Sequence, residues 1–498
     1  MWTIVLYVLL GLVALALAAF LLLGRGRHIA TGRFGRMARI GRLGARLWTS
    51  WLGAKLRRLF TGKARRARYD EARRKRDAAA VAQTMGQMKG AFMKLGQMMS
   101  FITDGIPAEY RAALATLQAQ APPMDAALLR DVAERELGRP LERAFARFDE
   151  EPLASASIGQ VHRARLPDGR EVVVKIQYPG VAEAITADLA NVGVLYRMMA
   201  MFYPNLDPRP VVEELRSRIT EELDYAREAR NQTLFHQRYL EHPFIRVPEV
   251  ITSHSSARVL TSEYVAGRRF ADLLAGDPAA RSRWGEILWR FVFSSIIEHG
   301  VFNGDPHPGN YLVDDQDRVV FLDFGCIKYF PAQMLSDWLA LVRSHFDGEP
   351  EQFRANAVRL GFLPESAPVT GATLYEYFGY FYEPFRSDRE FLFTSEYNAA
   401  SIRMIFKPDG PFTGLHKQLN LPADFVFVNR IQWGVYSIMA QLQAAGNWHR
   451  IHREYLYGEP PHSELGRIDH AWRADAAQRR GSGASSKVGG ATDSPARC

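Results

Sequence analysis

The sequence predicts an α+β protein in two lobes, one built on a small sheet and the other mainly helical. Three observations lead to this prediction. Residues 160–166 and 171–177 read as two strands joined by the turn PDG, which is typical of a β-hairpin. The stretch RVLTSEYVAG, residues 258–267, reads as a further strand that ends at a glycine break. The C-terminal half reads as helices separated by prolines, among them Pro408 and Pro422.

Length and composition are those of a folded protein with more than one domain. The 498 residues are enough for two or three domains, and 47% hydrophobic with 23% charged residues allow a sizeable core. The two cysteines, Cys326 and Cys498, exclude a disulfide framework and a multi-cysteine zinc site. We therefore expect a reducing compartment, and we expect Cys326 to be a small buried side chain.

Positive charge is concentrated near the N-terminus. Residues 25–76 carry 18 Lys and Arg against two acids, so this segment is +16 and the rest of the +9 chain sums to −7. The pI of about 9.5 is therefore no sign of nucleic-acid binding, and we expect no nucleic-acid partner. Clustered Lys and Arg beside an apolar segment attract anionic lipid instead, unless they serve only as a topology signal.

The apolar segment itself predicts a membrane anchor. Trp2–Leu23 is an uncharged run of 22 residues, long enough to cross a bilayer core as a helix. The positive charges follow this run rather than precede it, which favours an uncleaved anchor over a signal peptide or a buried helix. By the positive-inside rule we expect a single span, with the N-terminus outside and the catalytic body in the cytoplasm.

Two aspartates and an asparagine carry the predicted chemistry. Asn310 follows Asp305 by five residues, and Asp323 follows thirteen residues later in the motif DFG. This order matches the catalytic segment of kinases, in which Asp305 would position the nucleophile while Asn310 and Asp323 would bind Mg²⁺. Lys175, at the end of the strand VVVK, can reach nucleotide phosphates if a carboxylate fixes it. Glu222 is a candidate for that carboxylate, and so is Glu228.

The rest of the expected nucleotide site departs from common phosphate-binding loops. The sequence has no Walker A loop and no GxGxxG, and small residues precede the first strand instead: Ala154, Ser155, Ala156 and Ser157. Backbone groups of Glu263 and Val265 fit a hinge between two lobes that binds adenine. We therefore predict ATP and Mg²⁺ as cofactors.

Four motifs resemble the UbiB/AarF family of atypical kinases, called ADCK in animals. They are MKLGQ with Lys94 and Gln97, LASASIGQVH, EELDYAREARN, and NGDPHPGN with DFG. The resemblance covers residues 79–440 and implies a two-lobed protein-kinase-like fold with an N-terminal helical extension that carries the KxGQ motif. In this chain a transmembrane helix would precede that extension.

The resemblance also implies roles for particular residues. Lys175 would pair with Glu222, while Lys94 and Gln97 would enter the pocket, contact Glu228 and block access for a protein substrate. The implied activity is hydrolysis of Mg-ATP, or transfer of its γ-phosphate, at a membrane. The implied partners are ubiquinone or other isoprenoid-lipid intermediates.

The predicted organisation has six parts. They are an anchor at 1–24, a basic segment at 25–78, the helical extension at 79–130, a nucleotide lobe at 131–266, a helical lobe at 267–475 and a disordered tail at 476–498. Two alternative functions stay open. NGDPHPGN is similar to a loop of aminoglycoside and choline kinases, which would make the protein a small-molecule phosphotransferase. A nucleotide-binding pseudokinase that acts as a membrane scaffold is the other alternative.

Overall fold

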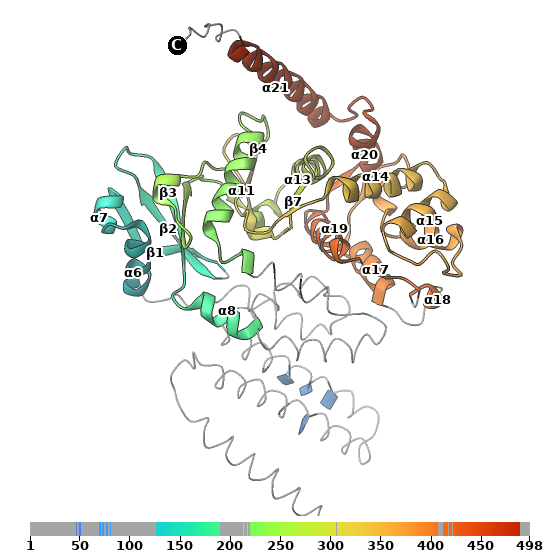
Figure 1. Cartoon of the computed structure of the whole chain (residues 1–498), viewed down its shortest axis with the longest axis horizontal. Coiled ribbons are helices and arrows are strands. Elements are labelled where there is room, and N and C mark those ends of the chain that lie inside the picture. Colours follow the sequence, from blue (N-terminus) through green and yellow to red (C-terminus); the bar gives the residue numbers. More distant parts are fainter. Residues whose placement is uncertain are drawn as a thin grey trace, which may run out of the picture. The chain divides into compact units, whose positions relative to one another are not determined.

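The structure is a computed structural model, and it describes most of the chain from residue 126 to residue 488 (Figure 1). The described residues are 46, 49–50, 69–70, 72–73, 76–77, 80, 126–156, 158–189, 213, 217, 220–304, 306–406, 412–416, 418–420 and 422–488. The expected anchor Trp2–Leu23 lies outside them, as do Lys94, Gln97, Ser157 and Asp305.

The chain divides into two compact units. One consists of Met1–Val132, Glu151–Val161 and Ile176–Met201, and the other of Ala133–Glu150, His162–Lys175 and Phe202–Cys498. Helix α8 (Val181–Leu189) belongs to the first unit, whereas α6 (Ala126–Leu137) contributes residues to both. Short helix α7 (Leu141–Ala144) and all elements from α11 onward belong to the second unit.

A four-stranded sheet contains the predicted hairpin. Its strands are β1 (Arg147–Ser155), β2 (Gly159–Arg165), β3 (Glu171–Gln177) and β5 (Val259–Glu263), in that order. The predicted hairpin and the predicted strand after residue 258 are therefore confirmed, whereas β1 was not foreseen. Side chains alternate along β3, so that Val172 and Val174 are buried on one face while Lys175 faces the other.

A second sheet holds the predicted catalytic segment. Its strand order is β4 (Ile245–Arg246), β9 (Val319–Phe321), β8 (Tyr311–Val313) and β6 (Arg268–Arg269), with β8 and β9 paired antiparallel. A separate pair, β7 (Val301–Asn303) and β10 (Ile327–Tyr329), flanks the same segment. This arrangement positions the two predicted metal ligands, because Asn310 directly precedes β8 and Asp323 follows β9.

Helices make up the rest of the second unit (Figure 1). They are α11 (Tyr225–Arg238), α12 (Phe270–Leu273), α13 (Pro278–His299), α14 (Ala332–Phe346), α15 (Pro350–Arg359), α16 (Gly371–Gly379), α17 (Ser395–Phe406), α18 (Thr413–His416), α19 (Ala423–Leu442), α20 (Trp448–Tyr457) and α21 (Glu464–Val488). Short 3₁₀ turns lie at Thr252–His254, Pro308–Asn310 and Glu383–Phe385, and β11 (Phe391–Leu392) pairs with β12 (Ala445–Gly446).

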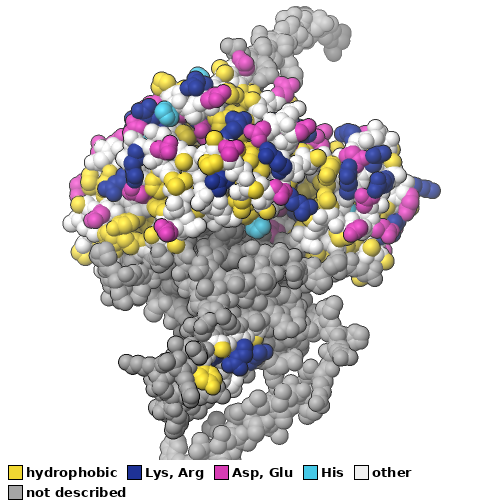
Figure 2. Space-filling view, turned by 180° about the vertical axis from the view of Figure 1, so that it is seen from behind, with side chains coloured by type: hydrophobic (Ala, Val, Ile, Leu, Met, Phe, Trp, Pro, Cys, Tyr) yellow, Lys and Arg dark blue, Asp and Glu magenta, His cyan; other side chains and the backbone are white. Residues whose placement is uncertain are grey.

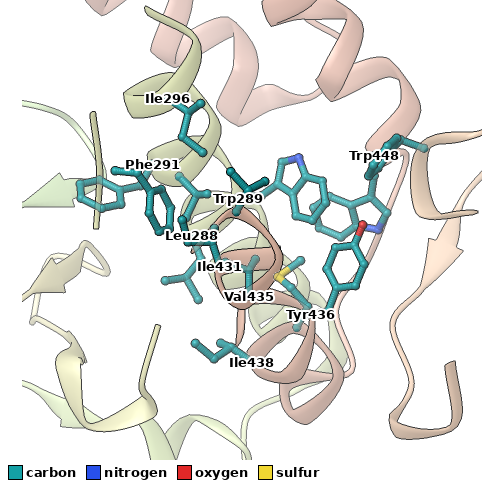
Figure 3. Packing of buried hydrophobic residues seen from close by; sticks show 14 of the residues in the cluster. Leu288, Trp289, Phe291, Ile296, Ile431, Val435, Tyr436, Ile438 and Trp448 are labelled. Carbon is teal, nitrogen blue, oxygen red and sulfur yellow. The ribbon is translucent and has the colours of Figure 1, made fainter. Parts of the chain in front are cut away.

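Helix α13 is the centre of this unit. Asp277 caps its first turn by accepting from the N–H groups of Ala279 and Ala280, and Gly300 ends it in the left-handed conformation. Its buried face packs against α19, and Figure 3 shows Trp289 lying among side chains that include Tyr436 and Trp448. This aromatic core fixes the helix that leads directly into β7 and the catalytic segment.

Two sequence predictions can be judged at the level of the fold. Cys326 is buried, as expected. The disordered tail begins too early in the prediction, because α21 continues through residues 476–488. Good helix formers in AWRADAAQRR extend this helix before the glycines begin. Among the described residues, no helix is both long and apolar enough to cross a bilayer.

Charges of both signs are interspersed on the described part of the face drawn in Figure 2. Many exposed charged side chains of the described residues are paired, as in Arg450 with Asp388 and Arg389 with Glu383. Such exposed pairs contribute little to stability, about 0–1 kcal/mol each. The excess positive charge of the sequence lies in residues 25–76, and most of these residues lie outside the described ones.

Candidate active site

A single ammonium group and two carboxylates form the centre of the candidate site. Lys175 Nζ donates to Glu228 Oε1 at 2.8 Å and Oε2 at 3.0 Å, and it lies 3.5 Å from Asp323 Oδ2. The lysine comes from β3, the glutamate from the first turn of α11, and the aspartate from the segment after β9. Strands and a helix far apart in sequence thus bring together residues that the motifs predicted separately.

The partner of Lys175 is Glu228, so the expected pairing with Glu222 is wrong. The charged segment is not one continuous helix, because it breaks into a turn at residues 222–223 and α11 begins after Asp224. The Asp224 side chain caps the new helix by accepting from the N–H of Arg227. This restart places Glu228 on the first turn facing Lys175, while Glu222 stays in the preceding turn.

Burial and unequal charge shift the pKa values of this cluster. Burial raises the pKa of Glu228 to about 7, the positive charge of Lys175 opposes the shift, and the charge of Asp323 adds to it. Burial alone would lower the pKa of Lys175, but Asp323 and Glu228 outweigh it, so that the lysine pKa lies well above its ordinary value. Among the described residues, the two carboxylates of this cluster therefore share a single cation.

An aromatic ring lies beside the same lysine. Lys175 Nζ is 4.9 Å from the centre of the Tyr225 ring, which belongs to the first residue of α11. A cation over an aromatic face is attracted by the ring, most strongly where water is excluded. The Tyr225 hydroxyl is buried and, among the described residues, accepts and donates no hydrogen bond. Burial raises the pKa of this phenol far above its ordinary value, so the hydroxyl stays protonated.

The DFG segment is held by several hydrogen bonds. The side-chain amide of Asn303 donates to the carbonyl of Asp323, and the N–H of Gly325 donates to Asp323 Oδ1 at 2.9 Å. The N–H of Gly304 donates to the carbonyl of Cys326 at 2.6 Å, where β7 and β10 meet. Asn303 precedes Asp305 by two residues, at the place where many kinases carry a histidine. Here its amide fixes the peptide of Asp323, the predicted metal-binding aspartate.

Asn310 and Asp323 are brought to the same end of the β8–β9 pair. The N–H of Leu322, the residue before Asp323, donates to the carbonyl of Asn310 at 3.0 Å. This backbone hydrogen bond connects the two segments that carry the predicted metal ligands. An amide and a carboxylate supply the oxygen atoms that Mg²⁺ prefers. Within the described residues, no three His, Cys, Asp or Glu side chains are grouped as a metal site. The donor set therefore fits a magnesium ion that keeps several ligands from water and phosphate.

The loop after Asp305 is packed tightly against α19. A side-chain carbon placed on Gly434 would come within 2.2 Å of Pro306 Cγ, so only glycine permits this approach. In the same loop, His307 Nδ1 accepts from the N–H of Gly309 at 3.0 Å. The catalytic segment is thus positioned by the helical part of the unit as well as by its own strands.

The predicted hinge residues lie at the end of β5. The N–H of Glu263 donates to the carbonyl of Glu249 at 2.8 Å, and the Glu263 carboxylate pairs with Arg246. Among the described residues, the N–H of Val265 has no hydrogen-bond acceptor. That free donor suits the predicted contact to adenine, which stays a prediction. Ala154 and Ser155 end β1 in the first unit, and the N–H of Ala156 donates to the carbonyl of Gly159 at 2.9 Å.

A pocket of about 420 Å³ lies elsewhere in the second unit. It is lined by Asp388, His449, Arg450, Arg453, Glu459, Pro460, Pro461 and His462. Its charged groups are already paired with one another, since Arg450 binds Asp388 and Arg453 binds Glu459. It also contains none of the predicted site residues, so its size does not make it the candidate active site.

Sequence reasoning missed three features of the site. Tyr225 and Asn231 lie within the motif EELDYAREARN, but nothing in that motif shows which of its residues face the lysine. The contact of Gly434 with Pro306 joins segments more than a hundred residues apart. Such contacts have no local signal in a single sequence, whereas a helix cap at Asp224 could have been recognised.

Comparisons with known proteins agree with the geometry. Residues 116–355 match the family described as ABC1 atypical kinase-like domain. The chloroplastic protein ACTIVITY OF BC1 COMPLEX KINASE 8 of Arabidopsis thaliana is 34% identical over 311 residues, which are 60% of this chain and 40% of the relative. The mitochondrial atypical kinase coq-8 of Caenorhabditis elegans is 28% identical over 410 residues, 77% of this chain and 52% of the relative.

A solved structure is also similar. It is the complex of Rv3197 with erythromycin from Mycobacterium tuberculosis, which matches with a TM-score of 0.58 and 31% identity. The match covers 75% of this chain and 95% of the other. By contrast, the chain spans about half of the length of the curated relatives, or less.

Proposed function

Because the chain belongs to the ABC1 atypical kinase-like family, we propose that it binds Mg-ATP and hydrolyses it, or transfers its γ-phosphate, at a membrane surface. One observation carries this proposal: the side chains of Lys175, buried Glu228 and partly exposed Asp323 meet in one cluster. A kinase-like enzyme needs these three groups together, since lysine contacts phosphate, glutamate orients lysine and aspartate binds metal.

The chain's own residues would divide the work as follows. Glu228 holds the Lys175 ammonium, which then faces the phosphate oxygens as a fixed positive charge. Asn303 and Gly325 hold Asp323 so that its carboxylate can bind metal together with Asn310. Mg²⁺ bound there would neutralise charge on the phosphate oxygens. Asp305 would position the attacking hydroxyl or water.

The excess negative charge of the cluster supports the metal assignment. Burial and the charge of nearby Asp323 raise the pKa of Glu228 to about 7 although the Lys175 ammonium opposes the shift, so keeping Glu228 ionised at neutral pH is costly. A divalent cation on Asp323 would remove this shortage of positive charge, and Lys175 would then be free to leave Asp323 for phosphate. Ionisable residues with strongly shifted pKa values are common at sites that a ligand completes.

Membrane attachment and the acceptor are further parts of the proposal. The apolar run Trp2–Leu23 and the basic residues 25–76 support a membrane-anchored protein that contacts anionic lipid. Lys94 and Gln97 would exclude a peptide from the pocket, so the acceptor is water or a small lipid. The lipid class that the family resemblance implies is ubiquinone or another isoprenoid lipid.

The test is Mg²⁺-dependent ATP hydrolysis by the full chain in vesicles with and without anionic lipid, beside Asp323→Asn. We expect turnover that rises with anionic lipid and is lost in the variant. Nucleotide binding without turnover under all conditions would instead favour the pseudokinase scaffold. Turnover that appears only with a small soluble acceptor, and that Lys94→Ala leaves unchanged, would favour a phosphotransferase.

A further inference from the structure

Three residues on one face of α11 lie along the candidate site. Glu228 binds Lys175, Asn231 lies three residues later, and Phe235 follows four residues after that. These spacings place the three side chains on the same side of a helix. The Phe235 ring packs 5.1 Å from the ring of Phe324, the middle residue of DFG. Asn231 therefore lies between the lysine partner and the metal-binding segment.

Asn231 makes two hydrogen bonds whose directions are fixed. Its Nδ2 donates to the carbonyl of Phe324 at 3.1 Å, and its Oδ1 accepts from the hydroxyl of Tyr329 at 2.9 Å. Because the carbonyl of Phe324 can only accept, the NH₂ group must face it, which leaves the amide oxygen for the tyrosine. The residue is only 3% exposed, so water cannot readily replace either partner.

Tyr329 connects this buried amide to the surface. It is the last residue of β10, where it pairs with Val301 of β7, and it is 49% exposed. The tyrosine hydroxyl thus fixes the orientation of the Asn231 amide. The pairing of β10 with β7 holds the chain that follows DFG. The Asn231 side chain therefore connects α11 to the DFG backbone and to β10.

We infer that Asn231 is a positioning residue that couples α11, and with it the Lys175–Glu228 pair, to the metal-binding DFG segment. The inference rests on the proposed function and adds a role that this function does not require. Without the amide, the peptide between Phe324 and its neighbours loses its anchor on α11, and the Asp323 carboxylate is held less firmly. The expected consequence is a weaker hold on Mg²⁺ rather than a loss of the fold.

The neighbouring residue supplies a matched control. Gln232 is 1% exposed, and its Nε2 donates to the carbonyl of Pro248 at 2.8 Å. It therefore makes the same kind of buried amide-to-carbonyl bond from the same helix, but to a segment away from DFG. Asn231→Leu and Gln232→Met each remove the amide and keep much of the side-chain shape.

The experiment is a Mg²⁺ titration of ATP hydrolysis and of nucleotide binding by the full chain in lipid vesicles. Asn231→Leu removes both hydrogen bonds of the amide, so it should raise the Mg²⁺ concentration for half-maximal turnover on the order of 5- to 10-fold, with turnover restored at saturating Mg²⁺. Gln232→Met should lower thermal stability without changing the Mg²⁺ requirement. Tyr329→Phe should shift the requirement in the same direction by about 2- to 3-fold.

The outcomes separate this inference from the proposed function. A wild-type Mg²⁺ requirement in Asn231→Leu, or an equal shift in Gln232→Met, would overturn the inference while the activity stands. If Asn231→Leu does not fold, Tyr329→Phe decides, because it removes only the outer bond; an unchanged requirement there also overturns it. A wild-type chain with neither turnover nor Mg²⁺-dependent nucleotide binding would refute the proposed function, and this inference with it.

Discussion

Two cations of the second unit, Lys175 and Arg290, are paired with their surroundings in different ways. Arg290 lies on α13, and its side chain is 1% exposed. It donates to Glu286, to both oxygens of Glu454, to Tyr455 and to Ser463. All five N–H donors of the guanidinium therefore have an acceptor.

The acceptors around Arg290 are themselves satisfied by further donors. Glu286 also accepts from Ser463, and Glu454 also accepts from the N–H of His462. The network thereby connects α13 with α20 and with the loop before α21. Burial alone would lower the pKa of Arg290, but Tyr455 and the two glutamates raise it, so the charge is secure. This arrangement has no need of a ligand.

The surroundings of Lys175 are incomplete by comparison. Among the described residues, Lys175 is the only side-chain donor to the Glu228 carboxylate, whose side chain is 3% exposed. Asp323 lies at the longer distance of 3.5 Å, and among the described residues the hydroxyl of Tyr225 has no hydrogen-bond partner. A saturated buried network indicates a structural role, whereas an unsaturated one indicates a site that a ligand completes.

The largest expected effects come from removing each cation. Arg290→Met leaves Glu286 and Glu454 buried without a counter-charge, and we expect a loss of about 3–5 kcal/mol in the free energy of unfolding. Lys175→Met should instead abolish turnover and cost less stability, because Glu228 can take up a proton near neutral pH. Urea unfolding and ATP hydrolysis, measured on both variants, check the contrast. A stable Arg290→Met chain without turnover would contradict it.

A pH series sharpens the same comparison. The Glu228 pKa is raised by burial from 4.5 to about 7, so between these values the folded state binds more protons than the unfolded state. Stability from this group therefore falls as pH rises through that window, by up to about 3 kcal/mol above pH 7. Glu228→Gln removes the effect, so the variant should gain stability relative to wild type from pH 5 to pH 8 while losing turnover.

The measurement is the difference in unfolding free energy between Glu228→Gln and wild type across this pH range. The difference is needed because several histidines, among them His345 and His452, contribute the opposite slope. Burial lowers the pKa of His345 and of His452 to about 3. Each histidine therefore destabilises the fold as the pH falls below the pKa that histidine has in the unfolded chain. A pH-independent difference would mean that Glu228 is ionised in the folded protein throughout.

The residues that the sequence predicted correctly share a local signal. The strand before Lys175, the hairpin turn and the DFG strand each follow from a few adjacent residues, and all three have the predicted secondary structure. The pairing of Glu228 could not be read with the same certainty, because both glutamates lie in one charged stretch. Which of them faces the lysine depends on where α11 begins, and Asp224 decides that.

Contacts between distant segments had no signal in the sequence. Asn231 and Phe324 are 93 residues apart, and Gly434 meets Pro306 across an even longer interval. Each contact depends on how helices pack, which one sequence does not encode in a short pattern. Tyr225 is a similar case, since a tyrosine at the start of a helix is usually only a core residue.

The smallest expected effect comes from Tyr225, and it asks whether the ring or the hydroxyl serves Lys175. Tyr225→Phe keeps the ring at the ammonium and removes a buried hydroxyl that has no partner, so turnover should stay near wild type and stability should rise by about 1 kcal/mol. Tyr225→Leu removes the ring, and the loss of a desolvated cation–π contact of about 2 kcal/mol predicts a KM for ATP raised on the order of 30-fold.

Steady-state kinetics with ATP and urea unfolding on both Tyr225 variants provide the measurement. Equal impairment of Tyr225→Phe and Tyr225→Leu would assign the role to the hydroxyl, which would then bind something that enters the site with the nucleotide. A defect in Tyr225→Leu alone would mean that the aromatic face supplements Glu228 in holding the ammonium. In that case Glu228 and the Tyr225 ring would both hold Lys175 in place, while its contact with Asp323 would give way to the proposed metal and phosphate.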